Sequence, residues 1–219
     1  METINFDPRL KGPFTMLIVG PTSCGKSHLV FKLIDNVKTL ITPPVEEIIY
    51  CFGQWQQEFE QFKNKVRFHQ GLMSRQELLE EDRDLSKHIL LIVDDLIDDQ
   101  YAPLMKDLFV KGSHHRNMSV IFITQNLFLP NKDYRTLSIN SHYVVLFKNP
   151  RDMSQIQALG RQAFPGNSTF LNQVYVNETS EPHSYILLDF KQSTEDRLRV
   201  RNSITSPWKT IVFIPDRKG

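Results

Sequence analysis

The chain has 219 residues, enough for one α/β domain with a sizeable core. Its hydrophobic content of 40% and charged content of 23% are those of a globular protein, and its net charge of +1 excludes a globally basic nucleic-acid coat. It has only two cysteines, Cys24 and Cys51, so a disulfide framework or a cysteine metal site is not expected, and a reducing setting fits.

Residues 1–11 contain acidic residues and a proline but no apolar run of signal-peptide length. No later segment approaches the ~20 apolar residues that span a bilayer. We therefore expect a soluble, intracellular protein without a membrane partner. No linker divides the chain, so we expect one domain over 1–219, with a core of about 14–190 and a peripheral extension over 191–219.

A run of apolar and β-prone residues, Phe14 to Val19, leads into Gly20-Pro21-Thr22-Ser23-Cys24-Gly25-Lys26-Ser27, and a helical pattern follows to Val37. These eight residues fit G-x-x-x-x-G-K-[ST], the phosphate-binding P-loop. A strand, a glycine-rich loop and a helix start direct backbone N–H groups and a helix dipole at one point. We expect Lys26 to reach the β- and γ-phosphates of ATP and Ser27 to bind Mg²⁺. The alternative is a chance match in an ordinary turn.

Apolar runs then alternate with helical patterns. The expected strands are Thr15–Val19, Glu47–Cys51, Val66–His69, His88–Asp94, Ser119–Thr124, His142–Phe147 and Tyr185–Phe190. The expected helices are Gln54–Lys63, Ser74–Glu81, a segment around Leu104–Phe109, and Asp152–Phe164. Continuous Ile, Leu, Val and Phe runs are typical of strands covered on both faces. The pattern predicts an α/β fold with a mainly parallel sheet.

The apolar strand that starts at His88 ends in two carboxylates, Asp94 and Asp95. In P-loop enzymes such a strand supplies an acidic residue to the Mg²⁺ shell, and we assign this role to Asp94. Asp95 is then the candidate for orienting and deprotonating the attacking water. The two carboxylates tolerate each other there because the cation offsets their repulsion. The alternative is a buried strand that ends in a polar turn.

A second buried strand, Ser119–Thr124, ends in Gln125 and Asn126. Gln125 is suited to hold the lytic water or to sense the γ-phosphate, since its amide both donates and accepts hydrogen bonds. The alternative is that Gln125 and Asn126 satisfy backbone groups of the loop.

The residues His114-His115-Arg116-Asn117 precede this strand. Adjacent histidines seldom converge on one ion and no further ligand lies at a suitable spacing, so a metal site is not expected. In ring-shaped ATPases an arginine of the neighbouring subunit neutralises charge on the transferred phosphoryl group. Arg116 is placed for that role, with Arg135, Arg151 and Arg161 as competitors and a surface arginine as the alternative.

With these motifs in this order, the chain resembles the FtsK–HerA superfamily of P-loop ATPases. More narrowly, it resembles the genome-packaging ATPases of large DNA viruses, including the poxvirus type and those of Polinton/Maverick elements and adintovirus-like viruses. The resemblance is carried by Gly20–Ser27, Leu90–Asp95, Gly112–Asn126 and Asn140–Asp152, and it spans about Phe14 to Phe190.

The resemblance implies a RecA-like core of the additional-strand class, a three-layer sandwich that assembles as a homo-oligomeric ring. It implies hydrolysis of ATP to move double-stranded DNA into a capsid, with a capsid or portal-like protein as partner. It places a glutamine at the tip of the sensor strand, matched by Gln125, and a trans-acting arginine ahead of it, matched best by Arg116. Many relatives carry Asp-Glu where this chain has Asp94-Asp95, so the shorter carboxylate must sit nearer the water or move closer on subunit closure.

Loops that grip DNA should carry Lys and Arg to its phosphates without reading bases. The candidates are Lys111–Arg116, Asn131–Arg135, and Arg197, Arg199 and Arg201, whose period-2 spacing predicts one face of a strand. Each is also explained as a solvated charged surface.

Two other functions stay open. One is a nucleotide or nucleoside kinase. The other is a non-hydrolysing, ATP-gated capsid-assembly module, which stays open because Asp95 stands where many relatives of the resembled family carry Glu.

Overall fold

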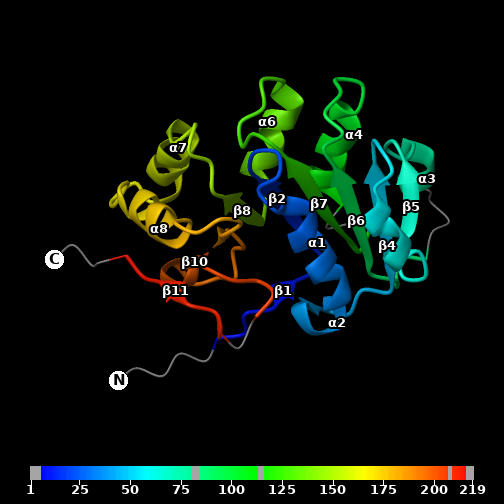
Figure 1. The fold of residues 1–219 in the computed structure, drawn as a ribbon. Helices are drawn as coiled ribbons and strands as arrows, with labels where there is room; N and C mark the ends of the chain where they lie inside the picture. The colour runs from blue at the N-terminus through cyan, green and yellow to red at the C-terminus, as the bar shows by residue number, and fades with distance from the viewer. Residues whose placement is uncertain (1–5, 80–83, 113–115, 207–208, 216–219) are drawn as a thin grey trace.

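The computed structural model describes residues 6–79, 84–112, 116–206 and 209–215, and a nine-stranded sheet is its framework (Figure 1). Across the sheet the strands lie in the order β11-β10-β9-β8-β2-β7-β6-β4-β5. Their bounds are β2 Thr15–Val19, β4 Glu47–Phe52, β5 Arg67–Gln70, β6 Ile89–Asp94, β7 Met118–Thr124, β8 Tyr143–Phe147, β9 Tyr185–Asp189, β10 Val200–Arg201 and β11 Val212–Phe213. A smaller parallel sheet pairs β1 (Leu10–Lys11) with β3 (Ile41–Thr42).

Six neighbouring strands, from β8 to β5, run parallel, which confirms the predicted mainly parallel sheet. Strands β9, β10 and β11 extend it antiparallel. Every predicted strand is present, with each end within one residue of its predicted position. The four strands that were not predicted, β1, β3, β10 and β11, have two residues each, too few to show a periodic pattern.

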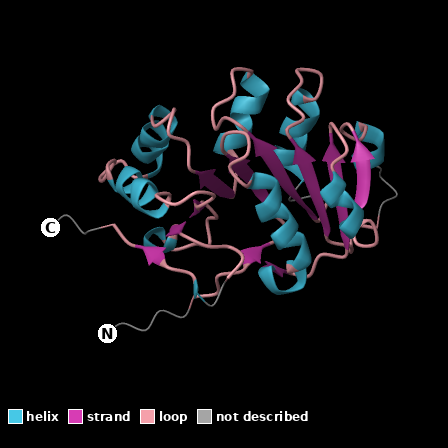
Figure 2. Ribbon diagram, in the orientation of Figure 1, coloured by secondary structure: helices cyan, strands magenta, loops and turns pink. Residues whose placement is uncertain are grey.

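Helices lie against both faces of the sheet (Figure 2). Their bounds are α1 Lys26–Asp35, α2 Val37–Leu40, α3 Arg75–Leu79, α4 Ala102–Asp107, α6 Lys132–Ile139, α7 Ser154–Ala163 and α8 Phe170–Glu178, with 3₁₀ segments η1 Gln57–Phe62 and η3 Asp196–Leu198 and a π-turn η2 Leu108–Gly112. The helix predicted over Gln54–Lys63 is thus a 3₁₀ helix. Helix α6 was not predicted, although Asn131 gives a local signal: its side chain accepts the Asp133 N–H and caps the helix.

The continuous apolar runs of the strands fill two cores, one on each face of the sheet. Alternate residues of β2 show this: Leu17 and Val19 belong to one buried cluster, while Met16 and Ile18 belong to the other. Helix α1 covers the second cluster, and α4, α7 and α8 cover the first. A strand buried on both faces has no polar face to show, which is why these runs read as unbroken.

The strand order decides where the polar loop residues meet. Strand β7 lies between β2 and β6, so the P-loop strand and the acidic strand are separated by one added strand. Parallel strands end on the same side of a sheet, which we call the carboxyl edge. The loop after β2, the end of β6 and the residue after β7 therefore lie together there.

No helix of the part that the structure describes is long and apolar enough to cross a membrane.

Candidate nucleotide site

The loop from Gly20 to Gly25 joins the end of β2 to the start of α1, as the P-loop motif predicted. Gly20 lies against two side chains: a Cβ there would be 2.6 Å from Cys24 Sγ and 2.7 Å from Phe147 Cβ. Gly25 has φ of 106° at the N-cap of α1, a backbone conformation that an L side chain rarely adopts. Both glycines of the motif are thus required by the shape of the loop, and the helix start directs its free N–H groups into it.

The Lys26 side chain folds back onto the first two residues of this loop. Its ammonium donates hydrogen bonds to the carbonyl oxygens of Gly20, at 2.6 Å, and Pro21, at 2.9 Å. The side chain is half-buried, so its charge is held at the loop and does not extend into solvent. A cation fixed beside several N–H donors is the arrangement that binds a polyphosphate.

Tyr50 of β4 connects the predicted metal ligands. Its hydroxyl donates to Asp94 Oδ2 at 2.7 Å, and the Ser27 side chain lies close enough to the same hydroxyl to influence its pKa. The ring is fully buried, and burial, followed by the charge of Asp94, raises the pKa of Tyr50. Sequence reasoning missed Tyr50; the available signal was a tyrosine inside a buried apolar strand, where its hydroxyl needs a partner. The structure therefore brings Ser27 and Asp94 together through one buried hydroxyl.

Asp94 ends β6 in a half-buried position. Burial raises the pKa of its carboxyl; the hydrogen bond from Tyr50 opposes this shift, the charge of Asp95 adds to it and Lys26 opposes it. A carboxylate that is poorly solvated by water is stabilised by a bound cation, which compensates for the missing hydration. Ser27 and Asp94 are hard oxygen ligands, and Mg²⁺ is commonly held by one or two such groups together with substrate phosphates. These residues fit a magnesium ion.

We expect Asp94→Asn to lose Mg²⁺-dependent turnover and yet to unfold at a higher temperature than the wild type at neutral pH. The amide removes a charge that burial disfavours and keeps an oxygen for Tyr50. A folded-state pKa above the ordinary 3.8 makes the carboxylate destabilising, so the wild type loses stability as pH rises through that pKa. In thermal melts without Mg²⁺, the difference in melting temperature between Asp94→Asn and the wild type should increase with rising pH. Each kcal/mol of difference in the free energy of unfolding corresponds to roughly 2–4 °C.

Glu58→Gln is the matched control, since it removes an exposed carboxylate of η1. Its melting temperature should follow that of the wild type at every pH. An Asp94→Asn protein no more stable than the wild type across the whole range would contradict the assigned burial cost.

Asp95 and Gln125 meet at the carboxyl edge. Gln125 Nε2 donates to Asp95 Oδ2 at 2.9 Å, so the amide is turned toward the carboxylate and not toward loop backbone. Asp95 has φ of 52°, a left-handed conformation that Asp tolerates better than most residues, and its N–H is held by the Ile123 carbonyl at 3.0 Å. Both side chains are exposed. The pair therefore presents a carboxylate of fixed orientation to solvent beside the P-loop.

Arg116 lies at the other end of the sheet. It precedes Met118, the first residue of β7, while Gln125 follows the last residue of the same strand. Seven strand residues span roughly 20 Å. The structure therefore does not bring Arg116 to the P-loop of its own chain. Arg135, Arg151 and Arg161 lie in α6, after β8 and in α7, and each is exposed. His114 and His115 fall outside the described residues.

The third basic cluster predicted for DNA contact does not form. Arg197, Arg199 and Arg201 do not share a strand face, because 196–198 is a 3₁₀ helix and only Arg201 is in β10. Arg201 is 1% exposed and pairs with Asp189 at 3.0 Å, while Arg197 and Arg199 pair with Glu195 and Asp196. These acidic partners neutralise the three arginines in the structure.

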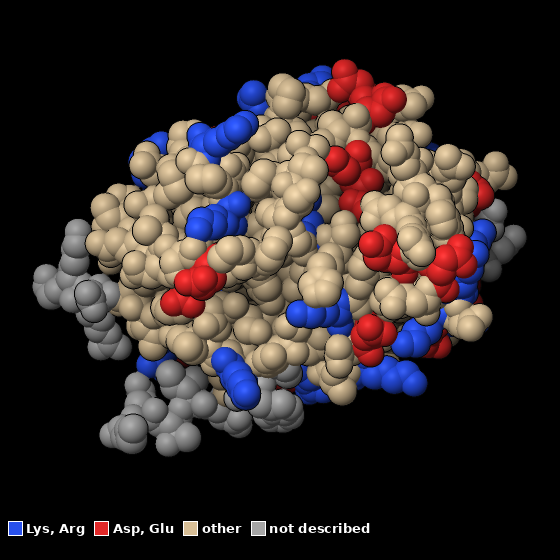
Figure 3. All heavy atoms as spheres, in the orientation of Figure 1, with Lys and Arg blue, Asp and Glu red and all other residues tan. Residues whose placement is uncertain are grey.

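Helix α6 is the basic candidate that remains near the site. Lys132 and Arg135 are exposed and three residues apart, so they share a face of this helix. The helix follows the loop that begins at Gln125, on the side of the carboxyl edge (Figure 1). The face of the molecule in Figure 3 shows both signs of charge and no broad basic area.

Metal ligands do not gather elsewhere in the ranges that the structure describes, where no group of three or more His, Cys, Asp or Glu side chains could hold an ion.

The fold is shared with solved P-loop NTPases. No protein-family model and no curated protein matches the sequence. The cytoplasmic domain of the type VII secretion ATPase EccC from Thermomonospora curvata superposes with a TM-score of 0.52 at 14% identity, covering 83% of this chain; this chain spans only 24% of that protein. The genome packaging NTPase B204 from Sulfolobus turreted icosahedral virus 2, in complex with ATP-gammaS, has a TM-score of 0.49 at 13% identity, covering 86% of this chain and 96% of its own.

A KaiC-like protein from Pyrococcus horikoshii has a TM-score of 0.44 at 12% identity, covering 92% of this chain and 90% of its own. At these identities the similarity concerns the fold alone. Together with the strand order, the match to EccC confirms the predicted fold class, a P-loop NTPase with a mainly parallel central sheet.

Proposed function

We propose that this chain is an ATP hydrolase of the FtsK–HerA superfamily that moves double-stranded DNA into a viral or virus-like capsid. It would act as a homo-oligomeric ring of single-domain subunits docked on a capsid or portal-like protein. The observation that carries this proposal is the hydrogen bond between Gln125 and Asp95 beside the P-loop. It fixes a carboxylate where a water molecule can be activated, and hydrolysis needs such a group.

The residues divide the chemistry among them. The N–H groups of the loop and the ammonium of Lys26 bind the triphosphate. Ser27 and Asp94 would hold Mg²⁺, which supplies charge neutralisation and phosphate orientation when bound. Gln125 keeps the Asp95 carboxylate in place to orient a water molecule and take its proton. The γ-phosphoryl group is then transferred to this water, and inorganic phosphate and ADP are released without transfer to another substrate.

Arg116 is assigned to the site of the neighbouring subunit. Arg116 precedes the amino end of β7, about one strand length from its own P-loop, so this assignment has it act on the P-loop of another subunit. An arginine placed on the transferred phosphoryl group neutralises charge that develops in the transition state. Since each P-loop would then be completed by a neighbour, hydrolysis should depend on assembly.

Mixing two inactive variants tests this assignment. We expect Arg116→Ala subunits and Lys26→Ala subunits to be inactive alone and to regain part of the wild-type turnover when mixed. In the mixture an intact P-loop of one variant can face an intact Arg116 of the other. Steady-state phosphate release over a series of mixing ratios is the measurement. Absence of recovery at any ratio, with mixed assemblies verified by particle mass, would rule out Arg116 as the trans-acting residue.

Displacement of a triplex-forming strand from linear duplex DNA tests the motor itself. ATP should drive displacement of the strand, while ATP-gammaS should not.

The Lys132→Ala, Arg135→Ala double variant should weaken DNA binding without a change in sequence preference, since phosphate contacts carry no base information. A protein that hydrolyses ATP but never displaces the strand would contradict DNA movement and leave hydrolysis standing.

A further inference from the structure

The register of two neighbouring strands brings Tyr50 to Asp94. In the parallel pair of β4 and β6, Phe52 lies beside Asp94. Tyr50 precedes Phe52 by two residues, so its side chain points to the same face of the sheet. Tyr50 and Asp94 are therefore diagonal neighbours on the face that α1 covers, within reach of a long aromatic side chain.

Three aromatic rings from different elements hold the ring of Tyr50. Phe31 of α1 stacks on it with 6.0 Å between centroids, while Phe59 of η1 lies at 5.2 Å and Phe68 of β5 at 5.6 Å. The Tyr50 side chain is fully buried. A close-packed ring cannot shift without moving its neighbours, so the Tyr50 hydroxyl is a donor of fixed position.

The two carboxyl oxygens of Asp94 are therefore not equivalent. Oδ2 accepts the hydrogen bond from Tyr50 at 2.7 Å, whereas Oδ1 accepts none from the residues that the structure describes. An ionised carboxylate can place both oxygens on one cation. Here Oδ2 can turn to a cation only if the buried hydroxyl of Tyr50 loses its acceptor, which is costly. Tyr50 thus limits Asp94 to one available oxygen.

This limit matters for the choice of ion. Mg²⁺ requires a small, near-octahedral shell and usually keeps several waters, so a single carboxyl oxygen suffices. Ca²⁺ takes a larger and more flexible shell of oxygens, which often includes both oxygens of one carboxylate. We propose that Tyr50 is a positioning residue that makes the site select Mg²⁺ over Ca²⁺, an inference that rests on the proposed function.

The test compares the binding of ATP-gammaS at saturating Mg²⁺ and at saturating Ca²⁺ by calorimetry. The wild type should bind it more tightly with Mg²⁺. Tyr50→Phe keeps the packed ring and removes only the hydroxyl, which leaves both oxygens of Asp94 free for the larger ion. The ratio of the two affinities should therefore shift toward Ca²⁺ by about 10-fold, the contribution of one hydrogen bond to a charged group.

A second comparison shows whether the shift passes through Asp94. Tyr50→Phe in an Asp94→Asn background should leave the ratio of the two affinities unchanged, because an amide has one oxygen to offer whether or not Tyr50 is present. A shift of the same size in this background would mean that Tyr50 affects the ion by another route, and would overturn the proposal.

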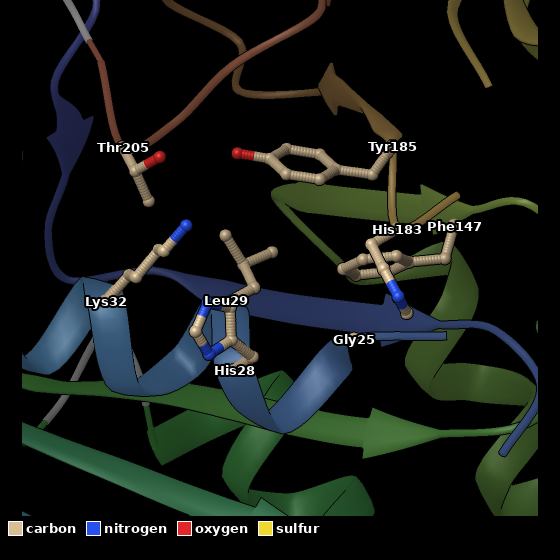
Figure 4. A pocket seen from close by; sticks show the side chains of 8 residues that line it. All are labelled: Gly25, His28, Leu29, Lys32, Phe147, His183, Tyr185 and Thr205. Atoms are coloured by element: carbon tan, nitrogen blue, oxygen red, sulfur yellow. The ribbon is translucent and has the colours of Figure 1, made fainter. Parts of the chain in front are cut away.

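Tyr185 gives the matched control, because it is near the P-loop but on the other side of β2 from Asp94. It lines a cavity of about 480 Å³ beside the P-loop, together with Phe147, Thr205 and residues of α1 (Figure 4). Its hydroxyl accepts the N–H of Ile204 at 3.1 Å, so it serves a backbone group and not a carboxylate. Tyr185→Phe should keep the wild-type ratio of the two affinities.

The outcomes separate this inference from the proposed function. If the wild type binds ATP-gammaS with neither ion, or if Lys26→Ala binds it as the wild type does, the phosphate site itself is wrong. Two results would overturn the role of Tyr50 and leave the phosphate site standing. One is a wild type that binds equally well with Mg²⁺ and Ca²⁺, which needs no variant. The other is a Tyr50→Phe protein that melts cooperatively and keeps the wild-type ratio, including a parallel loss of affinity with both ions.

Discussion

Lys26→Ala is expected to reduce ATP turnover by at least about 100-fold, because it removes the only cation that the structure places on the P-loop among the described residues. Its ammonium donates to the Gly20 and Pro21 carbonyls and is the group that would move onto the phosphates. Loss of a buried charge contact to a phosphate weakens binding as well as the transition state. Phosphate release and ATP binding by calorimetry are the two measurements.

Lys38→Ala is the matched control for this change, since it removes an exposed lysine of α2, outside the P-loop. It should keep wild-type binding and turnover. A Lys26→Ala protein with full activity would refute the site as a whole, whatever its other residues do.

Asp95→Asn is expected to bind ATP as tightly as the wild type and to release phosphate about 10²–10⁴ times more slowly. The amide cannot take a proton from water, but Asn tolerates the left-handed backbone at this position, so the loop should keep its shape. The measurements are single-turnover phosphate release and equilibrium ATP binding. A loss of binding equal to the loss of rate would show that Asp95 holds the ligand and does not act on water.

Two further variants sharpen this result. Asp98→Asn removes an exposed carboxylate three residues further on and should leave the rate unchanged. Asp95→Glu keeps a carboxylate on a longer side chain and should keep at least part of the activity. An Asp95→Glu protein as slow as Asp95→Asn would indicate that the hydrogen bond to Gln125 requires the shorter side chain.

Local sequence patterns predicted the seven longer strands, the P-loop and the positions of Asp94, Asp95 and Gln125 at the ends of their strands. Each of these features is local: an apolar run, a glycine pair, or a polar residue directly after a strand. The meeting of Asp95 and Gln125 follows because β6 and β7 are adjacent and parallel. Once the strand positions were predicted, chain order placed the two residues at one edge.

Contacts between distant segments could not be predicted in this way. Tyr50 reaches Asp94 because β4 is the neighbour of β6, which no local pattern states. Arg201 is in a basic run that looked solvated, but Asp189 on the neighbouring strand β9 pairs with it inside the protein. The cavity beside the P-loop also needs α1, β8, β9 and Thr205 to meet, and these are far apart in the sequence.

Steady-state phosphate release from ATP and Mg²⁺, with and without linear double-stranded DNA, tests the central claim most directly. The proposed function predicts that free phosphate is released, that DNA stimulates this release, that Lys26→Ala abolishes it, and that no phosphate is transferred to added nucleosides. Rapid transfer of phosphate to a nucleoside, or tight ATP binding with negligible release even with DNA at high protein concentration, would contradict it.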